Sequence, residues 1–297
     1  MFTGDYGFFD YKYNIEGYTG QDFGGLAQYL YLGICAVLLG ILLPCLRKSS
    51  PRRVRRIVGV TGIFLTLLYL GKTAWETFYD LQLSGAFNWY LLPLDSCSIV
   101  MPAALLAGFG RGRVRSWAAA WLATGGIVGG VATMVRLNAF HYYPFLSFGA
   151  FYSMLWHFLM LALGLLLIVT GAVEPGQGRG LRAATVNRGY LFHLIFSAVV
   201  IPVDFIFNFD FMLYRDLGGV PLFESVAGRL SAAGLRVLNP ILMLALYYLA
   251  FRIIWVISKA FPARNRESKR PPAACGDPVR ASMVGRGAPG LPEEEMK

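Results

Sequence analysis

Long apolar stretches alternate with short polar connections along this chain. The apolar stretches lie near residues 26–46, 56–79, 91–109, 117–135, 145–173, 189–208 and 237–261. Each holds about 20 residues or more, so a helix rising about 1.5 Å per residue would cross a hydrocarbon core about 30 Å thick. Backbone polar groups inside a bilayer must be bonded within their own segment, and this favours helices. The pattern predicts an all-α membrane protein, a bundle of seven transmembrane helices.

The composition supports this class. Hydrophobic residues make up 56% of the chain and charged residues 15%, whereas soluble domains carry about 25% charged residues. A soluble enzyme, a nucleic-acid-binding module and a disordered chain are therefore excluded. The net charge of +10 is explained by membrane topology, so no nucleic-acid partner is expected.

Lys and Arg predict the orientation of the bundle. Six of them lie in 47–56, three in 111–115 and eight from Lys259 onward, whereas 80–90 has none. Basic connections stay on the cytoplasmic side of a membrane. Since every other connection is basic, we expect the N-terminus outside, the C-terminus inside, and a multi-pass protein of the bacterial cell membrane.

Three regions are predicted. Residues 1–25 are acidic and rich in Tyr and Phe, which suits an extracellular segment at the membrane surface. Residues 26–261 form the seven-helix membrane domain. Residues 262–297 combine low hydrophobicity with many Pro, Gly and charges, as in a disordered cytoplasmic tail.

Known cofactor and metal motifs are missing from the sequence. It contains no CxxC, HExxH, P-loop or dinucleotide fingerprint. The four cysteines show no pairing pattern typical of a disulfide framework. We therefore expect neither a metal nor a cofactor.

Ionisable groups inside a span are costly and mark candidate functional sites. Lys72 and Glu76 are spaced i, i+4 and can pair. The other candidates are Asp95 and Cys97 in the third stretch, Ser153 and His157 in the fifth, and His193, Ser197, Asp204 and Asn208 on one stripe of the sixth. By the predicted topology all except His193 gather in the outer half of the bundle. Arg252 in the last stretch has no evident partner.

Structural interpretations remain open for these residues. Lys72 and Glu76 form an ion pair between helices in one interpretation, and Asp95 caps a helix that starts at Ser96. Ser153 and Ser197 bond back to carbonyls of their own helix. The small residues of 117–135 permit either close helix packing or an acyl-chain groove, and we expect packing.

Three segments carry a family resemblance: WYLLPLDSCSIVMPAALL (89–106), FYSMLWHFLMLALGLLLIVTG (151–171) and FNFDFMLYRD (207–216). They resemble the YwaF family of bacterial integral membrane proteins. That family is similar to an animal polytopic membrane protein implicated as an acyltransferase of ether phospholipids. The chain departs from the bacterial pattern at Asp95, where the pattern has His, and at Asp210, where it has Asn.

The resemblance implies that Cys97 is a nucleophile and His157 its base. A thiol deprotonated by His could carry an acyl group as a thioester to a lipid hydroxyl. Lys72 could then neutralise a phosphate, and Asp95, Asp204 or Asp210 could orient His157. Glu76, Ser153 and Asn208 complete the set of expected supporting residues.

Three functions remain open from the sequence. The first is a lipid acyltransferase whose partners are membrane phospholipids. The second is a small-molecule or ion transporter that uses the Lys, Glu and Asp cluster, although the sequence shows no inverted repeat of the kind common in transporters. The third is a non-enzymatic seven-helix sensor. Substrate, acyl donor and oligomeric state are not readable from the sequence.

Overall fold

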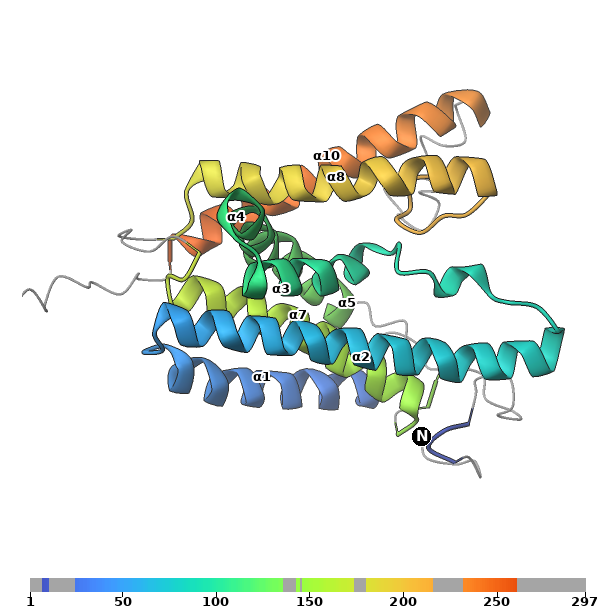
Figure 1. The fold of residues 1–297 in the computed structure, drawn as a ribbon, viewed down its shortest axis with the longest axis horizontal. Coiled ribbons are helices and arrows are strands. Elements are labelled where there is room, and N and C mark those ends of the chain that lie inside the picture. The colour runs from blue at the N-terminus through green and yellow to red at the C-terminus, as the bar shows by residue number, and fades with distance from the viewer. Residues whose placement is uncertain are drawn as a thin grey trace, which may run out of the picture. The chain divides into compact units, whose positions relative to one another are not determined.

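The computed structural model describes residues 7–10, 25–135, 143–144, 146–173, 180–215 and 232–260, which all belong to one compact unit, Met1–Arg264. Every regular element among these residues is a helix (Figure 1). The all-α prediction is confirmed. Most of the expected N-terminal segment, 1–25, and the whole expected tail, 262–297, lie outside the described residues.

Seven helices in the described part of the chain are long and apolar enough to cross a membrane. Among the first six spans, four are single uninterrupted helices: α1 (Leu26–Leu46), α2 (Pro51–Ser84), α7 (Phe148–Val169) and α8 (Ala183–Phe207). The third span is built from η2 (Trp89–Leu91), η3 (Ser96–Ile99) and α3 (Val100–Phe109). The fourth consists of α4 (Gly112–Trp121), the π-turn η4 (Leu122–Gly126) and α5 (Ile127–Val135), and the last is α10 (Ala232–Ser258). The predicted count of seven is confirmed.

Helix α2 is longer at both ends than its apolar stretch, 56–79. The Ser50 side chain accepts a hydrogen bond from the Arg53 backbone N–H at 3.3 Å, and Pro51 occupies the first turn, as suits a helix start. Gly85 ends the helix in the left-handed conformation, with φ 68°. Hydropathy alone marks where a helix is apolar, whereas these caps set where it ends.

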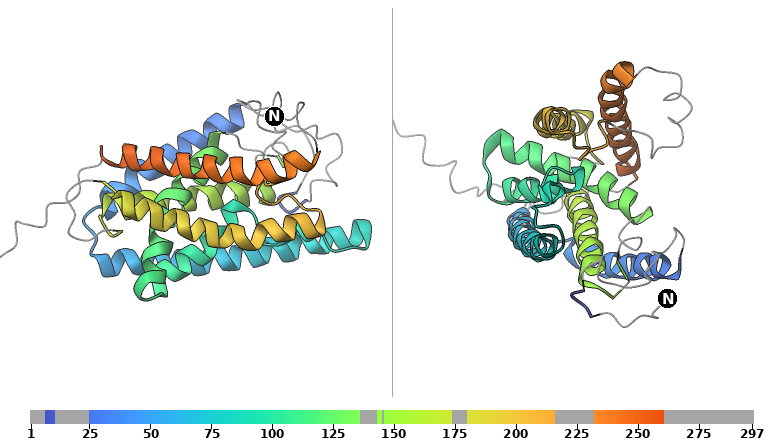
Figure 2. Two further views of the ribbon diagram at one scale, coloured as in Figure 1. Left: turned by 90° about the horizontal axis from the view of Figure 1, so that it is seen from above. Right: turned by 90° about the vertical axis from the view of Figure 1, so that its right-hand side faces the viewer.

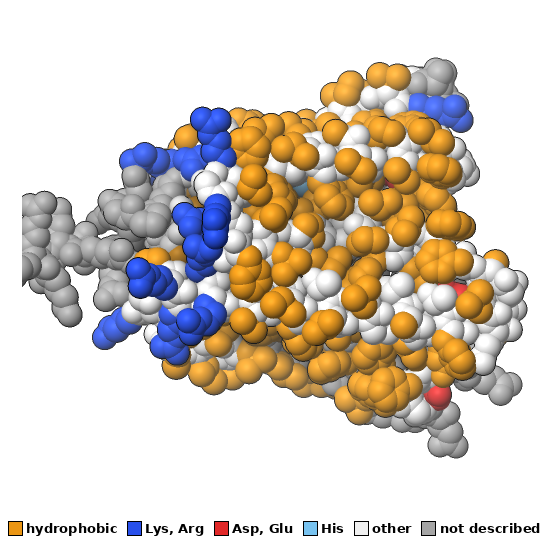
Figure 3. Space-filling model, in the orientation of Figure 1, with side chains coloured by type: hydrophobic (Ala, Val, Ile, Leu, Met, Phe, Trp, Pro, Cys, Tyr) orange, Lys and Arg blue, Asp and Glu red, His pale blue; other side chains and the backbone are white. Residues whose placement is uncertain are grey.

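Successive spans run in opposite directions, so their connections gather at two ends of the bundle (Figure 1). Lys and Arg crowd the end that carries 47–50 and 110–111 (Figure 3). Helix α2 packs on α3, α4 on α8, and α5 on α7. Helices α1 and α10 lie at opposite edges in the end-on view of Figure 2. In the most apolar 18-residue stretch of each helix only 11% of the residues are buried, as suits lipid-facing helices.

Small residues of the fourth span allow close helix packing. A Cβ atom on Gly130 would lie 2.8 Å from Cβ of Leu161 on α7. A Cβ atom on Gly189 of α8 would lie 2.7 Å from Oγ1 of Thr124. Distances this short exclude a larger side chain, so these glycines serve the packing that we expected in place of an acyl groove.

Candidate functional site

The third span breaks its helix just before Cys97. Pro93 lacks an N–H group and disfavours helical backbone at the residue before it. Leu92 and Asp95 are extended, and Cys97 lies in the 3-10 turn η3. Non-helical backbone at membrane depth is tolerated where protein covers it or where it lines a polar cavity, and such breaks are frequent at binding sites.

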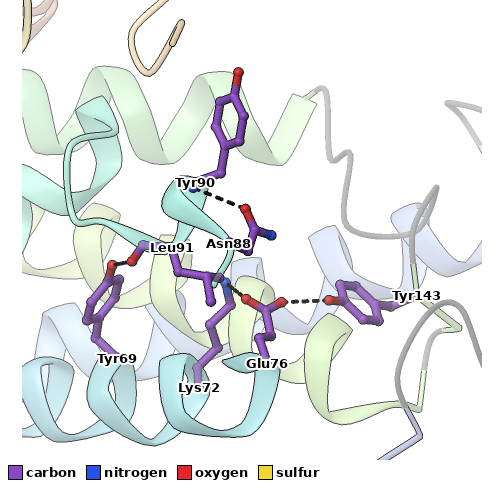
Figure 4. Close-up of polar contacts among 7 residues, drawn as sticks. All are labelled: Tyr69, Lys72, Glu76, Asn88, Tyr90, Leu91 and Tyr143. Atoms are coloured by element: carbon purple, nitrogen blue, oxygen red, sulfur yellow. Dashed lines mark hydrogen bonds and ion pairs between the residues drawn. The ribbon is translucent and has the colours of Figure 1, made fainter. Parts of the chain in front are cut away.

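Aromatic side chains of two other spans donate hydrogen bonds to backbone carbonyls of this broken stretch. The Tyr69 hydroxyl on α2 donates a hydrogen bond to the Leu91 carbonyl (Figure 4). The Trp156 indole N–H on α7 donates to the Cys97 carbonyl at 3.3 Å. The Cys97 segment is thereby attached to two other spans.

Lys72 and Glu76 form the predicted ion pair on α2 (Figure 4). Glu76 is 5% exposed and also accepts a hydrogen bond of 2.7 Å from the Tyr143 hydroxyl. Lys72 Nζ lies 5.6 Å from the ring centroid of Tyr152 on α7, a cation–π distance. The pair therefore lies between α2, α7 and the segment that precedes α7.

The charge of Lys72 also acts on the third span. Asp95 and the Cys97 thiol both interact electrostatically with Lys72. Asp95 lies at the N-cap position of η3 but makes no side-chain capping bond. Asp95 thus occupies the predicted cap position, but its side chain does not make the hydrogen bond of a helix cap.

Aromatic residues that the sequence analysis did not single out line the same site. The Trp156 ring centroid lies 6.0 Å from that of Tyr69 and 5.4 Å from that of Tyr152. Tyr247 on α10 interacts with Ser96 and with Cys97. Tyr152 and Trp156 are spaced i, i+4, so their shared helix face was a signal in the sequence. No comparable signal pointed to Tyr247.

His157 is buried and makes one polar contact among the described residues. Its Nδ1 lies 2.7 Å from the Ser153 carbonyl oxygen. A carbonyl can only accept, so Nδ1 carries the proton and the neutral ring keeps a lone pair on Nε2. No hydrogen bond joins His157 to Cys97 within the described residues, and the Cys97 carbonyl is instead bonded by the neighbouring Trp156. Among the described residues of α7 the Ser153 hydroxyl has no hydrogen bond to a helix carbonyl, whereas we expected one.

Asp204, Asn208 and Asp210 organise the turn that follows α8. Asn208 ends the helix in the left-handed conformation, with φ 62°. Asp204 Oδ1 accepts from the Phe211 N–H at 3.2 Å, and Asp210 Oδ1 accepts from the Arg215 N–H at 3.0 Å. Arg215 in turn donates to Asn208 Oδ1 at 2.6 Å.

These contacts give the acidic turn a structural role. None of the three residues forms a hydrogen bond with His157 among the described residues. Asp204 alone interacts electrostatically with Asp95. Tyr214, which follows in the same turn, bonds the Ser197 hydroxyl at 2.6 Å, and burial raises the pKa of Tyr214 so that its hydroxyl keeps its proton.

His193 lies in a cage of aromatic rings that includes Tyr247, which also lines the Cys97 site. The Trp121 indole N–H donates to its Nδ1 at 3.4 Å, and its ring centroid lies 4.2 Å from that of Tyr247. The Ser197 hydroxyl donates to the His193 carbonyl at 2.9 Å, which confirms the expected bond within the helix. Arg252 does have a partner, contrary to expectation, because its Nε donates to the Tyr248 hydroxyl at 2.8 Å.

Metal-binding geometry is not found in the described part of the chain. No three His, Cys, Asp or Glu side chains there gather as metal ligands do. Cys35, Cys45 and Cys97 are free thiols.

Comparison with known proteins gives one result. The model of the TMEM164 family, a family of membrane proteins, matches residues 23–261, which include all seven spans and the whole cluster around Cys97. No curated protein and no solved structure matches the chain. The chain belongs to the TMEM164 family.

Proposed function

We propose that this protein transfers fatty acyl groups between phospholipids, with Cys97 as the nucleophile and His157 as the base. The observation that carries the proposal is the break in the third span. It places a thiol in a 3-10 turn within an apolar span, where the thiol interacts electrostatically with the ammonium group of Lys72. The resemblance of 89–106 and 151–171 to the YwaF family implies the same two residues.

The first step forms a thioester. His157 Nε2 accepts the thiol proton while Cys97 Sγ attacks the carbonyl carbon of a donor phospholipid ester. The bond between that carbon and the glycerol oxygen breaks, and His157 returns the proton to the leaving oxygen. The products are a lysophospholipid and an acyl-enzyme.

The second step reverses these roles. The hydroxyl of an acceptor lysophospholipid gives its proton to His157 and attacks the thioester carbonyl. The carbon–sulfur bond breaks, and the proton returns to Cys97. Each cycle moves one acyl group and consumes no cofactor.

The hydrogen bond of His157 supports its role as the base. A proton fixed on Nδ1 by the Ser153 carbonyl leaves Nε2 as the basic nitrogen. Because the two side chains share no hydrogen bond among the described residues, the proposal requires His157 to reach Cys97 when substrate is bound. Catalytic hydrogen bonds often form only in such complexes.

Lys72 supplies positive charge where the reaction develops negative charge. It interacts with Cys97 and lies over the Tyr152 ring, so it can stabilise a phosphate or the oxyanion of the attacked ester. Glu76 and Tyr143 hold Lys72 in place. Asp95 interacts electrostatically with the thiol and is the third ionisable group of the proposed site besides Lys72 and Glu76.

An acyl-exchange assay in proteoliposomes tests the proposal. The vesicles contain a phospholipid with an isotope-labelled acyl chain and an unlabelled lysophospholipid acceptor, and mass spectrometry follows the label. We expect Cys97→Ala and His157→Ala each to lower the transfer rate about 100-fold or more. Cys35→Ala removes a buried thiol of α1 as a matched control and should keep the rate. Equal rates for wild type and Cys97→Ala would overturn the proposal.

A transporter is the second candidate, favoured by one specific observation. Ionisable groups from three spans interact electrostatically: Lys72, the ion-pair partner of Glu76 on α2, acts on Asp95 of the third span, and so does Asp204 of α8. Asp204 Oδ2 is buried without a hydrogen-bond partner among the described residues. Substrate uptake that survives Cys97→Ala and is lost in Asp204→Asn would favour transport.

We also propose how the bundle is oriented and in which membrane it lies. The Lys- and Arg-rich end of the bundle would face the cytoplasm of a bacterial cell, with the N-terminus outside. The site around Cys97 would then lie in the outer half of the plasma membrane.

A further inference from the structure

A cavity of about 380 Å³ opens at the basic end of the bundle, at the opposite end of α2 from Lys72 and Glu76. Its walls come from the first two turns of α2, from α3, from the start of α4 and from the end of α7. Figure 3 shows Lys and Arg gathered at this end. A volume of this size is typical of small-molecule sites, which range over about 300–1,000 Å³.

Three arginines line the cavity and no acidic residue does so among the described residues. Arg55 is already engaged, since its Nε donates to the Gly108 carbonyl at 2.6 Å and holds the end of α3 in place. Arg52 and Arg115 make no hydrogen bond or ion pair within the described part of the chain. Two guanidinium groups therefore line one cavity, and no acidic side chain among the described residues lines it with them.

The inner wall of the cavity is apolar. Val54, Val58, Ala107 and Leu167 line it and are each at most 6% exposed. Val54 and Val58 lie three and seven residues beyond Pro51, so the apolar wall extends from about 5 to about 10 Å along the helix from the rim, at about 1.5 Å per residue. A ligand that fits has an anionic group at the rim and an apolar part below it.

We propose that this cavity binds the phosphate of an anionic phospholipid, with Arg52 and Arg115 on the phosphate and the start of an acyl chain against Val58 and Leu167. Planar guanidinium groups suit phosphate oxygens because they can donate paired hydrogen bonds. The ligand chemistry is a phosphate ester, and the apolar wall favours a lipid over a soluble ester as its source. The site is separate from Cys97 and does not depend on the proposed acyl transfer.

Thermal unfolding of the full-length chain in detergent tests the site. The probes are dioctanoyl phosphatidic acid, dioctanoyl phosphatidylcholine and inorganic phosphate, each titrated separately. The test variant is Arg52→Gln/Arg115→Gln. The matched control is Arg53→Gln/Arg113→Gln, which removes the same charge from neighbouring exposed positions of the same two helices that do not line the cavity.

We expect phosphatidic acid to raise the unfolding temperature of the wild type saturably, and phosphatidylcholine to do so weakly. The test variant should bind phosphatidic acid about tenfold or more weakly, because it lacks two charge-assisted hydrogen bonds. The control should match the wild type. Equal weakening in both variants, or no saturable shift in the wild type, would overturn the site. If inorganic phosphate raised the unfolding temperature as much as phosphatidic acid does, the cavity would be a phosphate site, and the proposal that its ligand is a lipid would be overturned.

A second measurement needs no variant. A phosphatidic acid with a photoreactive group near the start of its acyl chain is crosslinked to the wild type in vesicles, and the adduct is mapped by peptide mass spectrometry. Adducts on 51–58 or 107–119 support the cavity. Adducts confined to the exposed faces of α1 and α10 contradict it.

Discussion

At the scale of single residues, the ion pair of Lys72 and Glu76 was predictable because its partners lie one turn apart on one helix. The third partner, Tyr143, was not, since it is 67 residues away from Glu76 in sequence. The same holds for Trp156 and the Cys97 carbonyl, 59 residues apart. Helical spacing predicts partners on one helix and carries no information about partners on another.

Lys72→Met leaves the Glu76 carboxylate buried without its ion partner. We expect a loss of about 2–3 kcal/mol in the free energy of unfolding, below the usual cost for a fully buried pair because the Lys72 side chain is 21% exposed. Lys72→Met/Glu76→Gln should recover more than half of it. SDS-induced unfolding measures the effect, with Arg113→Met as a control for an exposed charge. If the double variant were as unstable as Lys72→Met alone, the loss of stability would not come from the unpaired Glu76 carboxylate.

Trp156→Phe removes the hydrogen bond to the Cys97 carbonyl and keeps an aromatic ring. We expect acyl transfer to slow about tenfold, since a misplaced nucleophile is costly, while stability falls by about 1 kcal/mol. Trp75→Phe is the matched control, because its indole N–H donates to the Phe9 carbonyl at 3.0 Å, away from Cys97. Equal rates in the two variants would show that this bond does not position Cys97.

At the scale of elements, the broken third span is the main departure from a simple hydropathy reading. The sequence placed Pro93 and Pro102 on either side of Cys97 and left open a helix start at Ser96. The structure has a 3-10 turn there and an α-helix only from Val100. Tyr69 and Trp156 donate hydrogen bonds from other spans to the Leu91 and Cys97 carbonyls of this stretch, and nothing in the sequence indicated these partners.

Close packing in the fourth and sixth spans makes a prediction about glycines. Gly189→Ala should destabilise the protein by about 1–3 kcal/mol, because its Cβ atom would overlap Thr124 and the Ala120 carbonyl. Gly71→Ala on α2 is the control, since a Cβ there meets nothing within 4 Å. That change should be neutral or stabilise the helix by up to about 1 kcal/mol. Both values are read from SDS unfolding, and a neutral Gly189→Ala would contradict the packing.

At the scale of the whole molecule, the number of spans followed from hydropathy. Which helices are neighbours did not, because helices that are apolar on all sides show no preferred face in their sequence. The contacts of α1 with α7 and of α4 with α8 are therefore known from the structure and were not predictable from the sequence. The membership of the cluster around Cys97 was only partly predictable, and its depth in the membrane stays a prediction.

The proposed orientation is tested by labelling cysteines in intact cells. In a chain whose four native cysteines are replaced, Ala86→Cys lies between α2 and η2, and Arg113→Cys lies at the start of α4. A membrane-impermeant maleimide should label Ala86→Cys in intact cells and Arg113→Cys only after permeabilisation. The reverse pattern would place the basic end outside and refute the orientation.

Intact-protein mass spectrometry gives the most direct test of the proposed chemistry. A variant with Cys97 as its only cysteine, made by Cys35→Ala, Cys45→Ala and Cys275→Ala, is incubated with phospholipid and no acceptor. We expect a mass increase of one acyl chain that neutral hydroxylamine removes, as a thioester requires, and that His157→Ala forms far more slowly. A protein that acquires no acyl adduct under these conditions, while it still exchanges acyl groups between lipids, would contradict Cys97 as the nucleophile.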